Sequence, residues 1–288
     1  MTMNNASEFG TADLERMVEA FADLSLRAGE IILDIRARGA AVMEKADHSP
    51  VTEADRRAEA LILAGLAEAC PGVPVVAEEA ASAGHVPATL GDHFILVDPL
   101  DGTREFIAGR PDFTVNIALI ERGSPIAGVV YAPMRRTLWA ASGHHAWSAD
   151  VQDDGTLGDA RGLVCRGWQA PPCIVASVSH RTPETDEFIA RFDGATMSAI
   201  GSSLKFCLLA EGEADLYPRY GRTMEWDTAA GDAVLRAAGG VTITLDEKPL
   251  VYGKRNQAND VDFANPFFIS ASREGVSRIK GEVRGTAR

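Results

Sequence analysis

The chain has 288 residues, of which 46% are hydrophobic and 24% charged, and its formal net charge is −13. This length allows one large domain or two ordinary ones, and no apolar stretch approaches the roughly 20 residues of a membrane-spanning helix. The acidic balance disfavours a surface for nucleic-acid polymers, but carboxylates gathered at one site could hold divalent cations that attract a phosphorylated metabolite.

The first half of the chain is predicted to contain two helices followed by strands. Apolar residues recur at three- and four-residue steps over 12–38, which predicts an amphipathic helix. A second helix is predicted over 52–70, where Pro71-Gly72 ends it. Short runs rich in valine, isoleucine and aromatic residues then predict strands at Val73–Ala77, His93–Val97, Phe113–Ile120, Ile126–Tyr131 and Thr137–Ala141.

A change of character near residue 170 predicts a boundary between an α+β half, 1–170, and an α/β half, 171–288. Beyond the boundary strands and helices alternate, at Ile174–Val178, Glu184–Phe192, Ser202–Ala210, Ala214–Tyr217 and Asp227–Ala238. The last segment, 272–288, is mildly basic and is expected to be a solvated tail.

The four cysteines and the N-terminus bear on the compartment. The cysteines stand at 70, 165, 173 and 207 and form no CxxC pair, so they are interpreted as buried thiols rather than disulfides or a zinc site. Residues 1–10 lack the basic and apolar segments of a secretory signal. A cytoplasmic location is therefore expected.

The strongest chemical signal is Asp98-Pro99-Leu100-Asp101-Gly102-Thr103, which follows a buried-looking strand. Two acids three residues apart, turned by proline and glycine, can converge on one point, and the Leu100 carbonyl can add an oxygen. Such hard oxygen ligands suit Mg²⁺. The N–H groups of Gly102 and Thr103, at the start of a short predicted helix, suit a phosphate oxygen.

Three further acidic positions each have a structural alternative. Thr52 to Asp55 forms a capping box for the second helix. The pair Glu78-Glu79 can be the solvated end of a strand, and Asp227 can cap the helix that follows it. Together with Asp98 and Asp101, however, these acids could hold the paired metal ions that phosphoryl hydrolysis uses, roughly 3.5–4 Å apart. No Walker A pattern, Gly-x-Ser-x-Gly elbow or His-x-x-x-His pair offers competing chemistry.

These residues resemble the inositol monophosphatase superfamily, whose signature is Asp-Pro-(Ile/Leu)-Asp-Gly-(Thr/Ser) with a later Trp-Asp-x-Ala-(Ala/Gly). The resemblance runs from roughly 12 to 269. Within the superfamily the sequence is most similar to the 3'(2'),5'-bisphosphate nucleotidase branch, on the segments Asp47–Asp55, Asp98–Ile107, Phe113–Leu119, Gly201–Cys207 and Leu216–Arg219. Arg104 stands where that branch more often has lysine, and Met224-Glu225 is unexpected and bears on the substrate pocket.

The resemblance implies a fold, an activity and a metal site. The implied fold is a layered αβαβα sandwich with the site between its halves. The implied metal ligands are Glu78, Asp98 and the Leu100 carbonyl for one Mg²⁺, and Asp98, Asp101 and Asp227 for a second. A third, weaker ion is common in the family, and Mn²⁺ could replace Mg²⁺. The implied catalytic groups are Thr103, hydrogen-bonded to Asp55, and Glu78, which would prepare water for direct in-line attack. Gly102 and Thr103 would bind the scissile phosphate.

A second phosphate of the substrate would be held away from the metals. The resemblance implies that Ser202 and Lys205, on one helical face, bind it together with Arg219, and that His180 contacts the nucleoside. Each residue has a plainer alternative: Ser202 as a helix N-cap, Lys205 and Arg219 as surface charges, and His180 as a loop residue.

The expected activity is removal of the 3'-phosphate of adenosine 3',5'-bisphosphate, a by-product of sulfate assimilation, to give AMP. Many enzymes of this branch are inhibited by lithium. The alternatives are a phosphatase for inositol-1-phosphate or fructose-1,6-bisphosphate, and a regulatory protein that binds phosphate or metal without turnover. The expected partner is the small phosphorylated substrate, with no integral membrane association, and a homodimer is left open.

Overall fold

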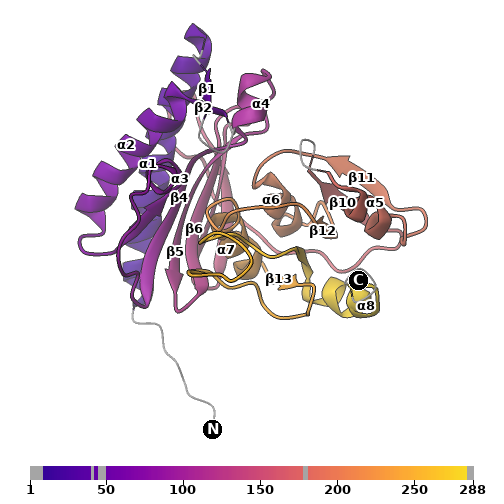
Figure 1. Cartoon of the computed structure of the whole chain (residues 1–288). Coiled ribbons are helices and arrows are strands. Elements are labelled where there is room, and N and C mark those ends of the chain that lie inside the picture. Colours follow the sequence, from indigo (N-terminus) through magenta and orange to yellow (C-terminus); the bar gives the residue numbers. More distant parts are fainter. Residues whose placement is uncertain (1–8, 40–41, 45–49, 178–180, 284–288) are drawn as a thin grey trace.

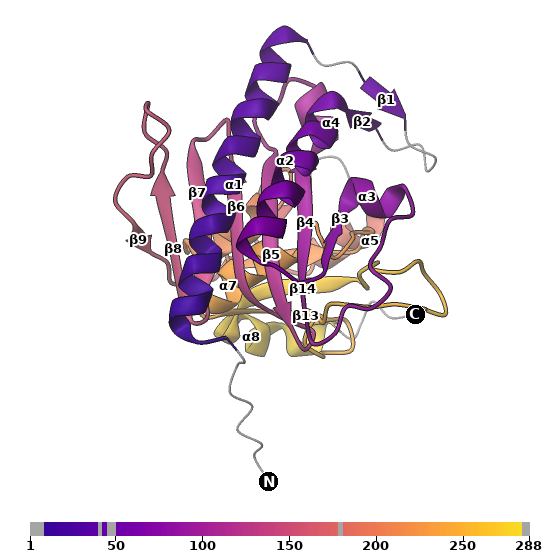
Figure 2. The ribbon, with the colours of Figure 1, turned by 90° about the vertical axis from the view of Figure 1, so that its left-hand side faces the viewer.

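A computed structural model of the chain describes residues 9–39, 42–44, 50–177 and 181–283. Two long helices, α1 (Thr11–Arg38) and α2 (Glu53–Ala69), pack together over one face of the first sheet (Figure 2). Helix α1 forms because its apolar residues recur on one face, and that face is buried against the sheet. Helix α2 begins with the predicted capping box, in which the Thr52 side chain accepts from the Ala54 N–H.

The first sheet has the strand order β3-β4-β5-β6-β7-β8-β9, and only β3 and β4 pair in parallel. Its strands are β3 (Val75–Ala77), β4 (His93–Asp101), β5 (Thr114–Glu121), β6 (Ser124–Ala132), β7 (Thr137–Ser142), β8 (His145–Asp150) and β9 (Arg161–Gly162). The short helices α3 (Glu78–Ser82) and α4 (Thr103–Ile107) follow β3 and β4, and β1 (Val42–Glu44) pairs with β2 (Pro50–Thr52). Every residue of β5 is buried, because helices cover both faces of this sheet.

The second sheet has the order β11-β10-β12-β14-β13 and mixes parallel with antiparallel pairs. Its strands are β10 (Cys173–Ala176), β11 (Thr196–Ala199), β12 (Leu216–Arg219), β13 (Gly240–Thr244) and β14 (Phe268–Ser272). The helices of this half are α5 (Pro183–Ile189), α6 (Leu204–Ala210), α7 (Ala229–Ala237) and α8 (Arg273–Val283).

Helices α6 and α7 lie between the two sheets and join them into one core (Figure 1). The buried cluster there combines Leu96 and Val130 of the first sheet with Phe206 and Val234 of these helices. Helices α5 and α8 cover the outer side of the second sheet through Phe188, Val276 and Ile279. The predicted αβαβα layering is therefore confirmed. The chain passes from the first sheet to the second between β9 and β10, close to the boundary near residue 170 that the sequence suggested.

Several sequence expectations about elements were wrong or incomplete. The expected solvated tail forms helix α8 as far as Val283, because Val276 and Ile279 pack against the second sheet. Two apolar positions are too few to show a helical period in the sequence. Strands β1, β2, β8, β9, β11, β13 and β14 and helix α3 were not predicted. Helices α6 and α7 begin two residues later than expected, at Leu204 and Ala229.

The cysteines and the apolar character of the helices can be compared with the sequence expectations. All four cysteines are free thiols; Cys70 and Cys207 are buried as expected, whereas Cys165 and Cys173 are half-buried. Among the described residues, no helix has both the length and the apolar character needed to cross a membrane.

Candidate functional site

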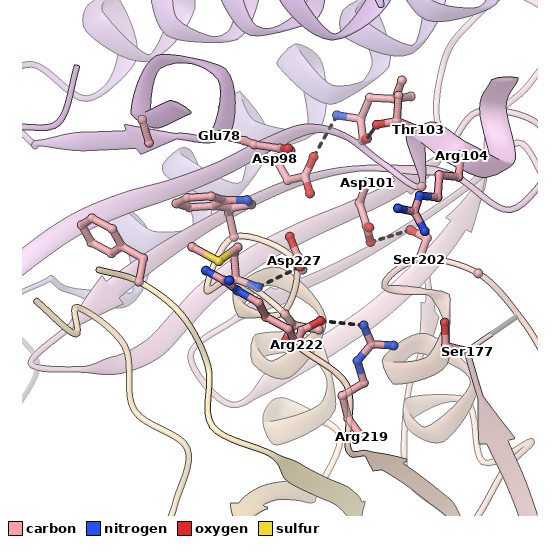
Figure 3. Close-up of a pocket in the computed structure, with 18 of the residues that line it drawn as sticks. Glu78, Asp98, Asp101, Thr103, Arg104, Ser177, Ser202, Arg219, Arg222 and Asp227 are labelled. Atoms are coloured by element: carbon pink, nitrogen blue, oxygen red, sulfur yellow. Dashed lines mark hydrogen bonds between the residues drawn. The ribbon is translucent and has the colours of Figure 1, made fainter. Parts of the chain in front are cut away.

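Four carboxylates from distant parts of the chain line one cavity of about 800 Å³ between the two halves (Figure 3). Glu78 begins helix α3 directly after β3, while Asp98 and Asp101 lie at the C-terminal end of strand β4. Asp227 lies just before helix α7, on the other side of the cavity. The structure thus brings together the acidic residues that the sequence resemblance assigned to metal ions.

The end of β4 has an irregular backbone that directs both of its acids into the cavity. The pairing with β5 shifts register between Asp98 and Asp101, and the Leu100 N–H donates to Asp98 Oδ1 at 3.0 Å. Gly102 follows with φ of 93°, and a Cβ there would lie 2.8 Å from the Asp112 carbonyl. Glycine is required at this position, because a side chain would both strain the backbone and clash.

The electrostatics of these carboxylates favour a bound cation. Asp98 is 1% exposed, and burial together with the charges of Glu78, Asp101 and Asp227 raises its pKa well above the usual range. Burial, Asp101 and Glu78 likewise raise the pKa of Asp227 to about 8. Within the described residues, no lysine or arginine forms an ion pair with Asp98. Ionised carboxylates at this density need protons or cations between them.

The carboxylates do not form a closed metal cage. In the part of the chain that the structure describes, no three acidic, histidine or cysteine side chains are close enough together to enclose an ion by themselves. Mg²⁺ ordinarily takes one or two carboxylates and completes its shell with waters and substrate phosphates. The oxygen donors of this cavity fit that mode of binding, which leaves room for a phosphate.

Glu59 of helix α2 fixes the segment that carries Glu78. Its carboxylate accepts from the Glu79 N–H at 2.7 Å and from the Ala80 N–H at 2.9 Å, at the start of α3. A carboxylate is favoured there because the first N–H groups of a helix have no partner within it. No sequence pattern distinguishes Glu59 from the other acids on α2.

Thr103 and Asp55 meet beside the carboxylates. Thr103 Oγ1 lies 3.1 Å from Asp55 Oδ1 and 3.1 Å from the Leu100 carbonyl oxygen, so its one hydrogen can serve either acceptor. Asp55 Oδ2 accepts from the Thr52 N–H at 2.7 Å and from the Thr52 hydroxyl at 2.6 Å. The capping box therefore uses one oxygen of Asp55 and leaves the other to Thr103, so the two interpretations of this motif are compatible.

Ser202 does not cap helix α6, contrary to the plainer alternative. It lies two residues before the helix with φ of 59°, and Ser203 is the N-cap residue. The Ser202 hydroxyl donates to Asp101 Oδ2 at 2.7 Å. The capping alternative for Asp227 is also wrong, because its Oδ2 accepts from the Met224 N–H at 2.9 Å and Thr228 occupies the N-cap position of α7.

Lys205 and Arg219 are buried cations on the cavity wall, so the surface-charge alternative is wrong for both. They are 3% and 6% exposed, and within the described residues neither is paired with a carboxylate. Lys205 Nζ donates to the carbonyls of Ile200 and Ser202, and Arg219 donates to those of Gly221 and Arg222. Burial and the charge of Arg219 lower the pKa of Lys205 to about 8. Buried cations of this kind can bind an anion, because they keep charged N–H donors that the backbone carbonyls do not use.

Some of the remaining predicted residues line the cavity and others do not. Met224 lines the cavity, as expected of a residue that bears on the substrate pocket, and Arg104 lines it as well. Glu225 does not; it is fully buried and accepts from the N–H groups of Gly253 and Lys254 at 2.6 and 2.9 Å. His180 lies outside the described residues. Arg222 and Ser177 also line the cavity and were not singled out in the sequence.

Known proteins resemble this chain over nearly its whole length. The model of the inositol monophosphatase family matches residues 13–274. The chain is 42% identical over 256 residues to the 3'(2'),5'-bisphosphate nucleotidase CysQ of Escherichia coli K12, covering 88% of this chain and 98% of that protein. The same-named protein of Salmonella typhimurium is 43% identical over 257 residues, with the same coverage.

Solved structures show the same fold. The crystal structure of CysQ from Bacteroides thetaiotaomicron, a bacterial member of the inositol monophosphatase family, superposes with a TM-score of 0.73 at 38% identity. The superposition covers 89% of this chain and 97% of that one.

Proposed function

Since the chain belongs to the inositol monophosphatase family, we propose that it is a metal-dependent 3'(2'),5'-bisphosphate nucleotidase that converts adenosine 3',5'-bisphosphate to AMP. The observation that carries this proposal is the polarity of the cavity. Its lining combines the crowded carboxylates with two buried cations, Lys205 and Arg219, that form no ion pair with an acid among the described residues. A substrate with one phosphate at the metals and a second at the cations complements both groups.

The proposed metal ligands are those that the family resemblance implies. Glu78, Asp98 and the Leu100 carbonyl would hold one Mg²⁺, and Asp98, Asp101 and Asp227 a second; a third ion and replacement by Mn²⁺ belong to the same proposal. Because the three aspartates do not enclose an ion by themselves, waters and the substrate phosphate would complete the shell of the second ion. When bound, these ions would neutralise the carboxylates, bind the scissile phosphate and make a water more acidic. The N–H groups of Gly102 and Thr103 would add contacts to that phosphate.

Thr103 and Asp55 are proposed to receive the proton of the attacking water, with Glu78 beside them. When the Thr103 hydroxyl donates to Asp55 at 3.1 Å, its lone pairs are free to accept a hydrogen bond from water. In the same arrangement the Leu100 carbonyl keeps its oxygen for a cation. Asp55 is held in place by Thr52, so this pair is fixed before substrate binds. No covalent intermediate with the protein is required.

Lys205 and Arg219 are proposed to bind the second phosphate, which for this substrate is the 5'-phosphate. Each donates two hydrogen bonds to backbone carbonyls and keeps further N–H groups for an anion. Ser202 remains in this proposed clamp through its carbonyl, which accepts from Lys205, because its hydroxyl is directed at Asp101. His180 remains a proposed contact to the nucleoside.

The clamp should make substrate affinity depend on pH. Because the pKa of Lys205 is about 8, the ammonium that binds the 5'-phosphate is lost above that pH. The KM for adenosine 3',5'-bisphosphate should therefore be nearly constant from pH 6.5 to 7.5 and should rise roughly tenfold by pH 9. Adenosine 3'-monophosphate, which lacks the 5'-phosphate, serves as the control. An equal rise in KM for both nucleotides would contradict this role of Lys205.

The stability of the protein should depend on Lys205 in the same pH range. Its folded pKa lies below the unfolded value of 10.5, so the unfolded chain binds more protons between pH 8 and 10.5. The contribution of Lys205 to the free energy of unfolding therefore increases as pH rises through that range. Melting curves of the wild-type protein and a Lys205→Met variant would isolate this contribution.

The function is tested by phosphate release from adenosine 3',5'-bisphosphate, inositol-1-phosphate and fructose-1,6-bisphosphate, with Mg²⁺, with EDTA and with added Li⁺. Strong preference for the nucleotide, lost with EDTA, is the expected result. Preference for inositol-1-phosphate or fructose-1,6-bisphosphate would support the proposed metal site but reject the nucleotide as substrate. No release from any of them would favour a regulatory protein that binds phosphate or metal without turnover.

We also propose a cytoplasmic location, which the four free thiols support. The division of the chain near residue 170 stays a proposal that the separate sheets support. Because α6 and α7 share a core with the first sheet, neither half is expected to fold without the other. A homodimer stays a prediction that sedimentation velocity would test.

A further inference from the structure

Ser203 joins parts of the site that come from both halves of the molecule. Its N–H donates to Asp101 Oδ2 at 2.7 Å, and its hydroxyl oxygen lies 3.1 Å from the same atom. The hydroxyl also lies 2.7 Å from the Asp227 carbonyl oxygen. One residue thus contacts a carboxylate at the end of β4 and the backbone of the segment that carries Asp227.

Asn116 of β5 donates a hydrogen bond to the Ser203 side chain. Its Nδ2 donates to Ser203 Oγ at 2.9 Å, while its Oδ1 lies 3.0 Å from the Thr114 hydroxyl oxygen. Asn116 pairs with Asp98 across the β4–β5 ladder, so it belongs to the same rigid strand pair as the first carboxylates. Because Ser203 Oγ accepts from Asn116, its own hydrogen is available only to Asp227 or Asp101.

These contacts leave Asp101 with one oxygen free. Asp101 Oδ2 receives the Ser202 hydroxyl and the Ser203 N–H, both at 2.7 Å, whereas no described residue donates to Oδ1. Ser203 is 2% exposed, so water does not compete for its hydrogen bonds. The orientation of the Asp101 carboxylate and the position of Asp227 are therefore both set by the start of helix α6.

We infer that Ser203 is a positioning residue that fixes Asp101 and Asp227 relative to each other, and so sets the affinity of the metal ion they share. This inference rests on the proposed function, because that function assigns one ion to the two aspartates. Ser203 does not line the cavity that would hold the substrate, so it would act through the two aspartates. Loss of a group that orients a metal ligand commonly costs about 10- to 100-fold in metal affinity.

The test is calorimetric titration of metal-free protein with Mn²⁺, without substrate. Ser203→Ala should weaken one class of Mn²⁺ site by about tenfold or more, and Ser203→Thr, which keeps the hydroxyl, should restore most of that affinity. Ser270→Ala is the matched control: Ser270 is fully buried and its hydroxyl lies 2.8 Å from that of Thr242, outside the cavity. It should bind Mn²⁺ as the wild type does, even if its melting temperature falls.

Glu59→Gln tests the selectivity of the effect, because Glu59 supports the segment of Glu78 instead. It should weaken a different class of Mn²⁺ site from the one that Ser203→Ala weakens. Wild-type affinity in Ser203→Ala, or equal losses in Ser203→Ala and Ser270→Ala, would overturn the inference. Failure of the proposed function would appear separately, as a wild-type protein that binds Mn²⁺ but does not release phosphate from the nucleotide.

Discussion

Replacing Asp98 with asparagine is expected to abolish phosphate release while it raises the melting temperature of the metal-free protein. Activity should fall by at least about a hundredfold to a thousandfold. The reason is that Asp98 is the proposed ligand of both metal ions, and these ions would stabilise the charge that develops on the phosphate. Stability should rise because Asp98 is buried against the charges of Glu78, Asp101 and Asp227. Asparagine has nearly the same shape and can still accept from the Leu100 N–H.

The expected gain in stability is about 1–2 kcal/mol, or roughly 2–8 °C for a chain of this size. Calorimetric melting in EDTA and phosphate release in Mg²⁺ measure the two effects on the same preparation. Excess Mg²⁺ should stabilise the wild type far more than the variant, because ions bind only to the folded site. The stability difference should therefore shrink or reverse when metal is present.

Asp215→Asn is the matched control for removing a buried carboxylate. Asp215 forms two hydrogen bonds with the Arg166 guanidinium, at 2.9 and 2.6 Å, and also accepts from the Cys173 N–H at 2.7 Å. Its loss should lower the melting temperature, since a buried carboxylate with partners stabilises the fold. If Asp98→Asn also lowered the melting temperature of metal-free protein, the idea of a strained carboxylate cluster would be wrong.

The sequence predicted those parts of the site that lie close together along the chain. Asp98 and Asp101 could be recognised because a buried strand, a proline and a glycine surround them, and each of these has a local structural meaning. Glu78 and Asp227 had respectable local alternatives, and only the family resemblance joined them to the others. Glu78 comes close to Asp98 because β3 and β4 pair in parallel, and Asp227 does so because helix α7 packs between the sheets; no local pattern records either arrangement.

The residues that support the site could not be predicted, for a different reason. Glu59, Asn116 and Ser203 act through hydrogen bonds to segments 20 to 102 positions away. Their side chains are ordinary for the elements that hold them. Ser202 shows the same limit, because a helical spacing from Lys205 suggested a shared face. Its φ of 59° instead turns its hydroxyl toward Asp101.

Lys205→Met is expected to remove the preference for a substrate with two phosphates. The value of kcat/KM for adenosine 3',5'-bisphosphate should fall by about a hundredfold, since hydrogen-bonded charge pairs in a buried site contribute about 2–5 kcal/mol. Activity on adenosine 3'-monophosphate should change much less, because Lys205 forms no hydrogen bond or ion pair with a carboxylate among the described residues and acts on Asp101 only through its charge. The ratio of the two activities is therefore the informative quantity.

Methionine suits this position because Lys205 is 3% exposed and its pKa is lowered by burial, so removing its charge should not harm the fold. Lys254→Met is the matched control, since Lys254 is half-buried and pairs with Glu225 at 2.7 Å. Lys254 supports the segment before Asp227, so its loss should destabilise the protein and reduce activity on both nucleotides alike. If Lys205→Met also reduced both activities equally, Lys205 would belong to the framework of the cavity, and the second phosphate would have to be bound elsewhere.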